Sequence, residues 1–315
     1  MAEGTWVPGS VGLFETGELA RRIEAGLGMM ESCTLCPRRC GVNRLAGETG
    51  YCRTGRRARV ASYNAHFGEE APLVGRRGSG TIFVSSCNLL CSFCQNAEIS
   101  HGNEGVDVTP GQMAAMMLDL AAMGCHNINI VTPTHVVPML LEALAAAVPQ
   151  GLSLPLVYNC GGYESVEALR LLEGVVDIYM PDFKFWDPQW AERFCQADDY
   201  PERAREALHE MHRQVGDLVL DETGIARKGL LVRHLVMPNN VAGTAEIMRF
   251  LAREISPDTY VNVMDQYRPC WEARKDPLID RRLTAAEFSA ALDAAHAAGL
   301  HRLDRRERPR IFFGL

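Results

Sequence analysis

The sequence predicts an α/β fold with a parallel sheet, because short apolar runs alternate with helical patterns along most of the chain. Strands separated by helices of roughly 10–15 residues form right-handed βαβ units. We expect strands at Thr81–Val84, Asn127–Val131, Leu154–Tyr158, Val175–Met180, Gly229–Val236 and Tyr260–Met264. These six strands are too few for a closed eight-stranded barrel, so we expect an open sheet.

The helices between these strands are expected from start signals and apolar patterns. Thr109 with Gln112, and Thr284 with Glu287, form capping boxes at the starts of two helices. Other helices are expected within residues 11–30, 136–147, 165–172, 201–215 and 244–254. We expect an N-terminal extension with a metal-binding module at 1–78 and the main domain with a C-terminal helix at 79–315.

Composition bears on the partners and on the compartment. The net charge of −7 offers no positive footprint for nucleic acid, and the short basic clusters at 56–59 and 305–306 are typical of solvated faces. The N-terminus has no basic segment leading into an apolar one, and no apolar run reaches the ~18 residues of a membrane span. We therefore expect a cytoplasmic protein that binds neither nucleic acid nor membrane.

The eleven cysteines are expected to bind metal rather than to form disulfides, because the cytoplasm is reducing. Seven of them fall in two clusters. The other four stand alone and are predicted to be small buried apolar residues: Cys125, Cys160, Cys195 and Cys270.

The central cysteine cluster follows the first expected strand. Cys87, Cys91 and Cys94 are separated by three and then two residues. Three thiolates can bind three irons of a 4Fe–4S cubane, which usually takes four. The remaining iron then keeps open coordination positions, where chemistry can occur. The alternative is a structural zinc ion with His101 as its fourth ligand.

This cysteine spacing, Phe93 before the third cysteine and Gln95-Asn96 after it resemble the radical S-adenosylmethionine (SAM) superfamily. The stretch is most similar to the activases of glycyl radical enzymes, the pyruvate formate-lyase activating enzyme-like branch, with an N-terminal four-Cys extension. The resemblance covers about residues 79–270 and implies an open partial (β/α)6 barrel of TIM-like type. It also implies that Phe93 and Asn96 lie at the cofactor.

The resemblance further implies a reaction and partners. The iron without a thiolate binds the amino and carboxylate groups of SAM, which is cleaved to methionine and a 5′-deoxyadenosyl radical that abstracts hydrogen. We expect the substrate to be a glycine of a glycyl radical enzyme, and the electron donor to be a flavodoxin or ferredoxin. The alternatives are radical modification of a small molecule or peptide, and a non-catalytic iron–sulfur or zinc protein for electron transfer or scaffolding.

A second cysteine cluster lies upstream, at Cys33, Cys36, Cys40 and Cys52. Four thiolates with glycines between them make a complete and closed ligand set. Such a set suits structural zinc or an auxiliary 4Fe–4S cluster, and the neighbouring iron–sulfur chemistry slightly favours the cluster.

Polar residues follow several of the expected strands, at the carboxyl ends where α/β barrels carry their chemistry. Thr132 and Thr134 stand where the activases have a Gly-Gly-Glu motif that receives the SAM amine, so their hydroxyls, or carbonyls freed by Pro133, are expected to replace it. Thr132 is alternatively a simple helix cap. Asn159 precedes Gly161, and glycine permits a close approach to ligand.

Charged residues follow the later strands. Asp182 and Lys184 are two residues apart, share one face, and resemble the Asp-Leu-Lys of the activases; a simple ion pair is the alternative. Arg233 lies in an apolar strand, so we expect it to face a ligand carboxylate. Arg268 stands near the histidine of the activase Pro-Tyr-His region, and this resemblance implies a contact with the adenine or ribose. The segment around His66, Glu69 and Glu70 is expected to be a solvated loop or a lid.

Overall fold

The structure is a computed structural model that describes residues 6–304, so the second basic cluster, at 305–306, lies outside the described residues. Six parallel strands form its centre in chain order: β2 (Ser79–Val84), β4 (Ile128–Val131), β5 (Leu156–Cys160), β6 (Ile178–Pro181), β8 (Ala226–Leu235) and β9 (Tyr260–Met264). They match the six expected strands. The described sheet is open rather than closed, since β2 pairs with β4 and, antiparallel, with β1 (Ala58–His66). The predicted α/β class is therefore confirmed.

Three antiparallel strands extend the sheet. β1 pairs with β2, β3 (Val106–Val108) pairs with the other edge of β1, and β7 (Val219–Leu220) pairs with β8. β1 corrects the expectation of a loop from residue 60 onward. Its apolar signal is weak, because only its first residues, Ala58 and Val60, are buried.

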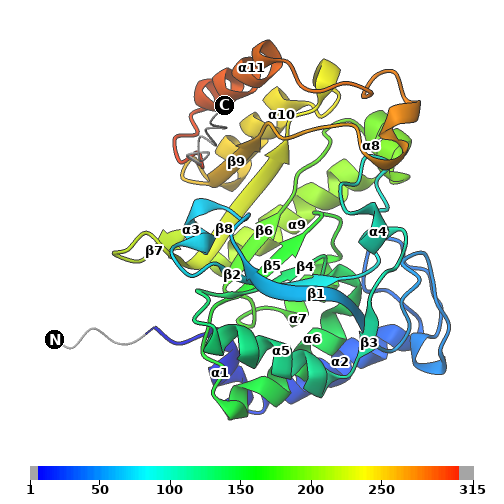
Figure 1. The fold of residues 1–315 in the computed structure, drawn as a ribbon, viewed down its shortest axis with the longest axis vertical. Coiled ribbons are helices and arrows are strands. Elements are labelled where there is room, and N and C mark those ends of the chain that lie inside the picture. The colour runs from blue at the N-terminus through cyan, green and yellow to red at the C-terminus, as the bar shows by residue number, and fades with distance from the viewer. Residues whose placement is uncertain (1–5, 305–315) are drawn as a thin grey trace, which may run out of the picture.

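Helices cover the outer face of the sheet, as Figure 1 shows. The expected ones are α5 (Pro110–Ala122), α6 (Val137–Ala147), α7 (Val166–Leu171), α9 (Tyr200–Val215), α10 (Thr244–Phe250) and α11 (Ala285–Ala298). The single helix expected within residues 11–30 is divided into α1 (Gly9–Glu15) and α2 (Glu18–Glu31), with Gly17 in a left-handed conformation between them. Both predicted capping boxes are present. The structure adds three short helices: α3 (Ala71–Val74), α4 (Ala97–Ser100) and α8 (Pro188–Cys195).

The N-terminal residues share the core of the main domain. Leu19 and Met30 of α2 are buried in the same apolar cluster as the strands and helices that follow, and α2 packs against α6. The described part of the chain contains no helix with the length and apolarity that a membrane crossing requires.

A second apolar cluster fills the amino-terminal part of the concave face. Leu73 of α3 packs there against Val157, Ile178 and Leu231, all fully buried. Because side chains alternate along a strand, these residues share the inner face with polar residues nearer the carboxyl ends. The inner face is therefore filled at one end, and its chemistry is confined to the other.

Candidate functional site

A cavity of about 270 Å³ lies at the carboxyl ends of the six parallel strands. Each of these strands, or the loop that follows it, contributes to the wall. The residues that matter below are Cys87, Cys91, Phe93, Cys94, Asn96, Thr132, Asn159, Asp182, Lys184 and Arg233. The predicted cysteines and most of the predicted cofactor residues are thus brought to one place.

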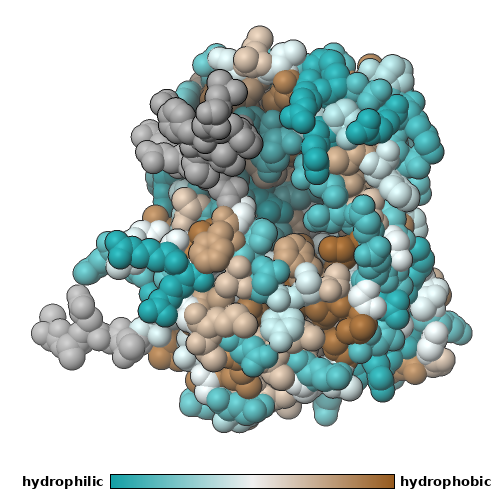
Figure 2. Space-filling view, in the orientation of Figure 1, coloured by the Kyte–Doolittle hydropathy of each residue, from teal (hydrophilic) through white to brown (hydrophobic). Residues whose placement is uncertain are grey.

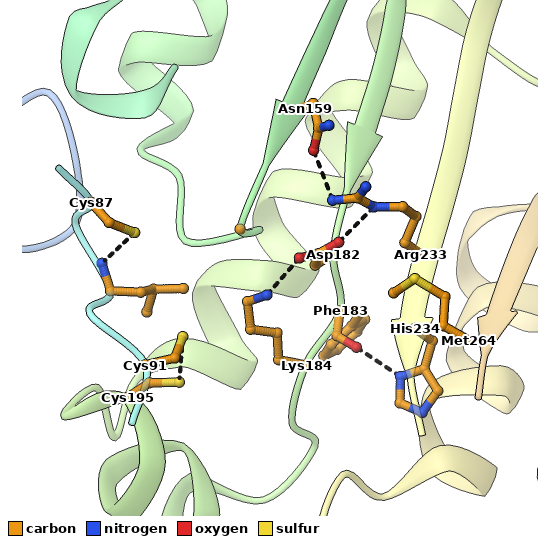
Figure 3. A network of polar contacts seen from close by, with 12 residues as sticks. Cys87, Cys91, Asn159, Asp182, Phe183, Lys184, Cys195, Arg233, His234 and Met264 are labelled. Carbon is orange, nitrogen blue, oxygen red and sulfur yellow. Dashed lines mark hydrogen bonds and ion pairs between the residues drawn. The ribbon is translucent and has the colours of Figure 1, made fainter. Parts of the chain in front are cut away.

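The cysteine loop follows β2 and is bent by two left-handed residues, Ser86 (φ 72°) and Leu90 (φ 52°). The backbone N–H of Leu89 donates to Cys87 Sγ at 3.3 Å, and Cys91 Sγ lies 3.2 Å from Cys195 Sγ of α8 (Figure 3). Cys94 Sγ lies 3.2 Å from the hydroxyl of Ser100. Left-handed backbone at residues other than glycine costs energy and is concentrated at functional sites.

The three thiols line the cavity wall together, and their surroundings raise the pKa of each. Burial raises the pKa of Cys87 to about 12 and also raises that of Cys94, while the Cys195 hydrogen bond and burial raise that of Cys91. Only a bound metal would make them thiolates near neutral pH. The described residues include no group of three or more His, Cys, Asp or Glu placed around one metal ion. A cubane instead spreads its ligands over separate irons, which fits thiols distributed along a cavity wall.

The zinc alternative gains no support from His101. Its Nδ1 lies 2.9 Å from the Ser100 hydroxyl, and its ring packs against Trp271. His101 is not among the residues that line the cavity.

An ionic network faces the cysteines across the cavity (Figure 3). Lys184 Nζ donates to one oxygen of Asp182 at 2.5 Å, and Arg233 Nε donates to the other at 2.8 Å. A second Arg233 nitrogen donates to the side-chain oxygen of Asn159 at 2.7 Å. Three predicted charged residues from two strand ends therefore form one connected unit.

The charges in this network stabilise one another. Burial alone would raise the pKa of Asp182, but the charges and hydrogen bonds of Arg233 and Lys184 outweigh it, and the pKa is lowered. Burial alone would lower the pKa of Lys184, yet the Asp182 carboxylate raises it. The network therefore keeps its ionised form, with an ammonium that has three donors, one of them used by Asp182.

The two threonines after β4 lie in different surroundings. Thr132 lines the cavity in a left-handed conformation (φ 62°), with its N–H bonded to the Asn159 carbonyl at 2.8 Å. Thr134 is buried outside the lining, and its hydroxyl donates to Glu164 at 2.6 Å. Glu164, which sequence reasoning missed, also accepts from the Tyr158 hydroxyl at 2.9 Å. Burial raises its pKa to about 7 despite these hydrogen bonds.

Of the remaining predicted cofactor residues, two line the cavity and one lies outside it. Phe93 and Asn96 line the cavity, and the Phe93 ring packs edge-on against Phe185 with centroids 5.8 Å apart. Arg268 is exposed and lines a separate depression with Cys94 and Trp271. The structure thus places Arg268 outside the cavity wall.

The four upstream cysteines lie near one another. Cys33, Cys36 and Cys52 are buried, and Cys40 is exposed. Burial, with smaller contributions from the other three thiols, raises the pKa of Cys36 to about 12. The backbone N–H of Tyr51 lies 3.4 Å from Cys40 Sγ. No single-ion arrangement occurs within residues 6–304, so the second metal stays a prediction.

Arg38, inside the upstream cluster, joins that segment to the central cysteine loop. Its guanidinium donates to the carbonyl of Asn88 at 3.0 Å and to the carbonyl of Cys195 at 2.9 Å. It also stacks over the Tyr51 ring, 4.0 Å from the centroid. The sequence offered no signal for this contact beyond a basic residue between cysteines.

Two acidic residues of the expected loop are buried instead. Glu69 is 7% exposed and lies 3.8 Å from Arg233; Glu70 is 4% exposed and accepts from Asn262 at 2.9 Å. The solvated-loop expectation is therefore wrong at these positions, because the pair packs against β8 and β9. An adjacent acidic pair before the apolar run 71–74 was the only available signal.

No family model matches the chain. It is 34% identical over 289 residues to the uncharacterized protein MJ0674 of Methanocaldococcus jannaschii, covering 89% of this chain and 78% of that protein. Among solved structures, it is similar to the radical SAM methyltransferase TsrM of Kitasatospora setae, which binds cobalamin and a 4Fe–4S cluster (TM-score 0.43, 17% identity, 60% of this chain and 36% of that one). It is also similar to HydG, a maturase of the FeFe hydrogenase, with a TM-score of 0.48 and 17% identity. That likeness covers 73% of this chain and 52% of HydG. Both are partial likenesses of fold alone.

Proposed function

The chain belongs to the family of the uncharacterized protein MJ0674 of Methanocaldococcus jannaschii, and we propose that it is a radical SAM enzyme. The observation that carries this proposal is the meeting of Cys87, Cys91 and Cys94 with an ionic network in one cavity at the strand ends. The six-strand open sheet supports it by presenting all these groups at one edge.

A 4Fe–4S cluster held by these three thiolates would supply an iron with open positions and the electron that cleaves SAM. The chain's own residues would bind the ligand and exclude water. Lys184 offers donors to a carboxylate, and Asp182 offers acceptors to an amine or hydroxyl. Phe83, Leu89 and Val131 form an apolar wall that excludes water from the reacting groups.

The finer proposal is that the radical is passed to a glycine of a partner glycyl radical enzyme. It is supported by the likeness of Asp182-Phe183-Lys184 to the activase Asp-Leu-Lys and by the placement of Arg233 beside it. A glycyl radical signal in a candidate partner, after incubation with the reduced enzyme and SAM, tests it. The second candidate, radical modification of a small molecule or peptide, is favoured by a larger acidic recess beside the cavity.

The main proposal is tested by SAM cleavage. The reconstituted protein, reduced without oxygen, should convert SAM to 5′-deoxyadenosine and methionine. Cys91→Ala should abolish this conversion, because two remaining thiolates leave two irons uncovered. Cys125→Ala is the matched control, since Cys125 is an equally buried thiol away from the cavity wall. Cleavage by Cys91→Ala at the wild-type rate would refute the assignment.

A further inference from the structure

A second recess of about 780 Å³ adjoins the cysteine cavity and shares Arg233, Met264 and Gln266 with its wall. Its other walls come from the segment 67–70, from β9 and the loop after it, and from the start of α11. Figure 2 shows a hollow with a hydrophilic floor beside β8 and β9 in the upper half of this face. A group bound there would lie next to the cavity in which the radical is proposed to form.

The recess is acidic. Four carboxylates line it, from Glu69, Glu70, Asp265 and Asp304, against the guanidiniums of Arg233 and Arg282. Arg233 lies 3.8 Å from Glu69 and also pairs with Asp182, which lies outside this recess, and Arg282 is exposed, so the four carboxylates outnumber the two guanidiniums. Cationic ligands are therefore favoured over anionic ones.

One of these carboxylates is incompletely satisfied. Glu70 is 4% exposed, and its Oε1 accepts from Asn262 at 2.9 Å. Its Oε2 is buried without a hydrogen-bond partner among the residues that the structure describes. A buried carboxylate oxygen without a donor is costly, so this position is suited to a donor supplied by a ligand.

The geometry of Glu70 also indicates which kind of cation the recess would bind. A guanidinium binds both oxygens of a carboxylate through a planar fork, whereas Asn262 already occupies one of them. An ammonium needs only a single oxygen at a time. The described carboxylates are not grouped around a point where a metal ion would sit.

We propose that this recess is the substrate site and that it binds an ammonium group, of a lysine side chain or of a small amine, at Glu70. The role of the recess as a substrate site rests on the radical SAM function proposed above, whereas binding of the ammonium group does not. Glu69 and Asp265 add negative charge along the recess, and the shared wall at Met264 and Gln266 places the ligand's carbon chain toward the cysteine cavity.

The test is equilibrium binding to the reconstituted full-length protein by calorimetry. The probes are Nα-acetyl-lysine amide, cadaverine, and Nα-acetyl-norleucine amide, an uncharged analogue that lacks the ammonium group. Binding of the lysine amide in preference to cadaverine would assign a peptide substrate, and the reverse preference a free amine. Equal binding of the norleucine compound, or no binding of either amine, would overturn the inference without needing any variant.

Variants then locate the site. Glu70→Gln keeps the acceptor for Asn262 and should weaken amine binding roughly tenfold or more, as expected for a buried charge pair that loses one member. Glu222→Gln removes the same charge from an exposed loop residue outside the recess wall and should leave affinity unchanged. Wild-type affinity in a folded Glu70→Gln protein would contradict the assignment to Glu70.

The two proposals fail separately. Cleavage of SAM by the wild-type enzyme in the absence of any amine tests the radical SAM function alone. Cleavage without amine binding refutes the ammonium site and leaves the enzyme function standing. Amine binding without SAM cleavage refutes the enzyme function and keeps the binding site.

Discussion

At the scale of residues, the site depends on charged groups that satisfy one another before any ligand arrives. Arg233 was expected to face a ligand carboxylate, and the structure gives it Asp182 and Asn159 as partners. This arrangement fits a positioning role as well as direct binding, since Arg233 still lines the cavity. SAM affinity separates these roles.

We expect Arg233→Met to weaken SAM binding by on the order of 2–4 kcal/mol, because the buried Asp182 loses a partner and the cavity loses a positive charge. Arg233→Lys should restore only part of the affinity, since an ammonium cannot reproduce the fork. Arg227→Met is the control, because Arg227 lies on the same strand but pairs with Asp221. Equilibrium SAM binding measures the effect. Binding within twofold of wild type would assign Arg233 a purely structural role.

Glu164 makes stability depend on pH. Its pKa is about 7 in the folded protein and 4.5 ordinarily, so the folded state retains a proton that the unfolded state has lost between these values. Its contribution to the free energy of unfolding is therefore fully present below about 4.5 and is lost as the pH rises through about 7. Glu164→Gln should remove this dependence, which amounts to about 3 kcal/mol.

Urea unfolding at about pH 5 and about pH 8 measures this difference. The variant should gain stability relative to wild type at the higher pH. Glu167→Gln, an exposed neighbour on α7, serves as control. If the free energy of unfolding changed equally in wild type and in Glu164→Gln between the two pH values, Glu164 would be ionised at both of them.

At the scale of elements, the upstream segment braces the central cysteine loop. Arg38 reaches the loop at Asn88 and the end of α8 at Cys195, and the backbone N–H of Ser92 bonds to Phe194 of α8 at 2.8 Å. The loop is thus held from the N-terminal side as well as by β2. We expect this support to slow the loss of any cluster bound at the loop.

We expect Arg38→Ala to release iron from the reconstituted protein faster, because the loop loses its hydrogen bonds to the upstream segment. Arg39→Ala is a close control, since Arg39 is exposed and lies 4.0 Å from Glu167 across the surface. The rate of iron transfer to a chelator is the measurement. Equal rates in the two variants would show that the brace does not affect the cluster.

At the scale of the whole molecule, the upstream cysteine segment is flanked by elements of the common core. α2 precedes it and packs on α6, and β1 follows it in the sheet beside β2. Disorder within residues 33–52 would therefore disturb both flanks.

For this reason Cys36→Ala should remove the second metal and lower the melting temperature of the entire protein, since binding at a closed site is coupled to folding. Iron, sulfide and zinc per chain, with the melting temperature, are the measurements. Cys270→Ala removes a half-buried cysteine outside both clusters and should change neither. Unchanged metal content and unchanged melting temperature in Cys36→Ala would exclude the site.

The sequence alone determined the strand and helix series, the capped helix starts and the three-cysteine loop after the first parallel strand. These features depend on periodicity and spacing within a few residues, so local sequence is sufficient to predict them. It also placed Asp182 and Lys184 on one face, since they are two residues apart on one strand end.

Only the tertiary structure decided which distant groups meet. Arg233 is 51 residues from Asp182 and 74 from Asn159, and Arg38 is 157 residues from the carbonyl that it reaches at Cys195. The burial of Glu70 likewise depends on β9, which begins far along the chain. Such contacts follow from the curvature and order of the sheet, which no local pattern contains. The sequence therefore determined which chemical groups the cysteine loop carries, while the fold decided the electrostatic surroundings of those groups.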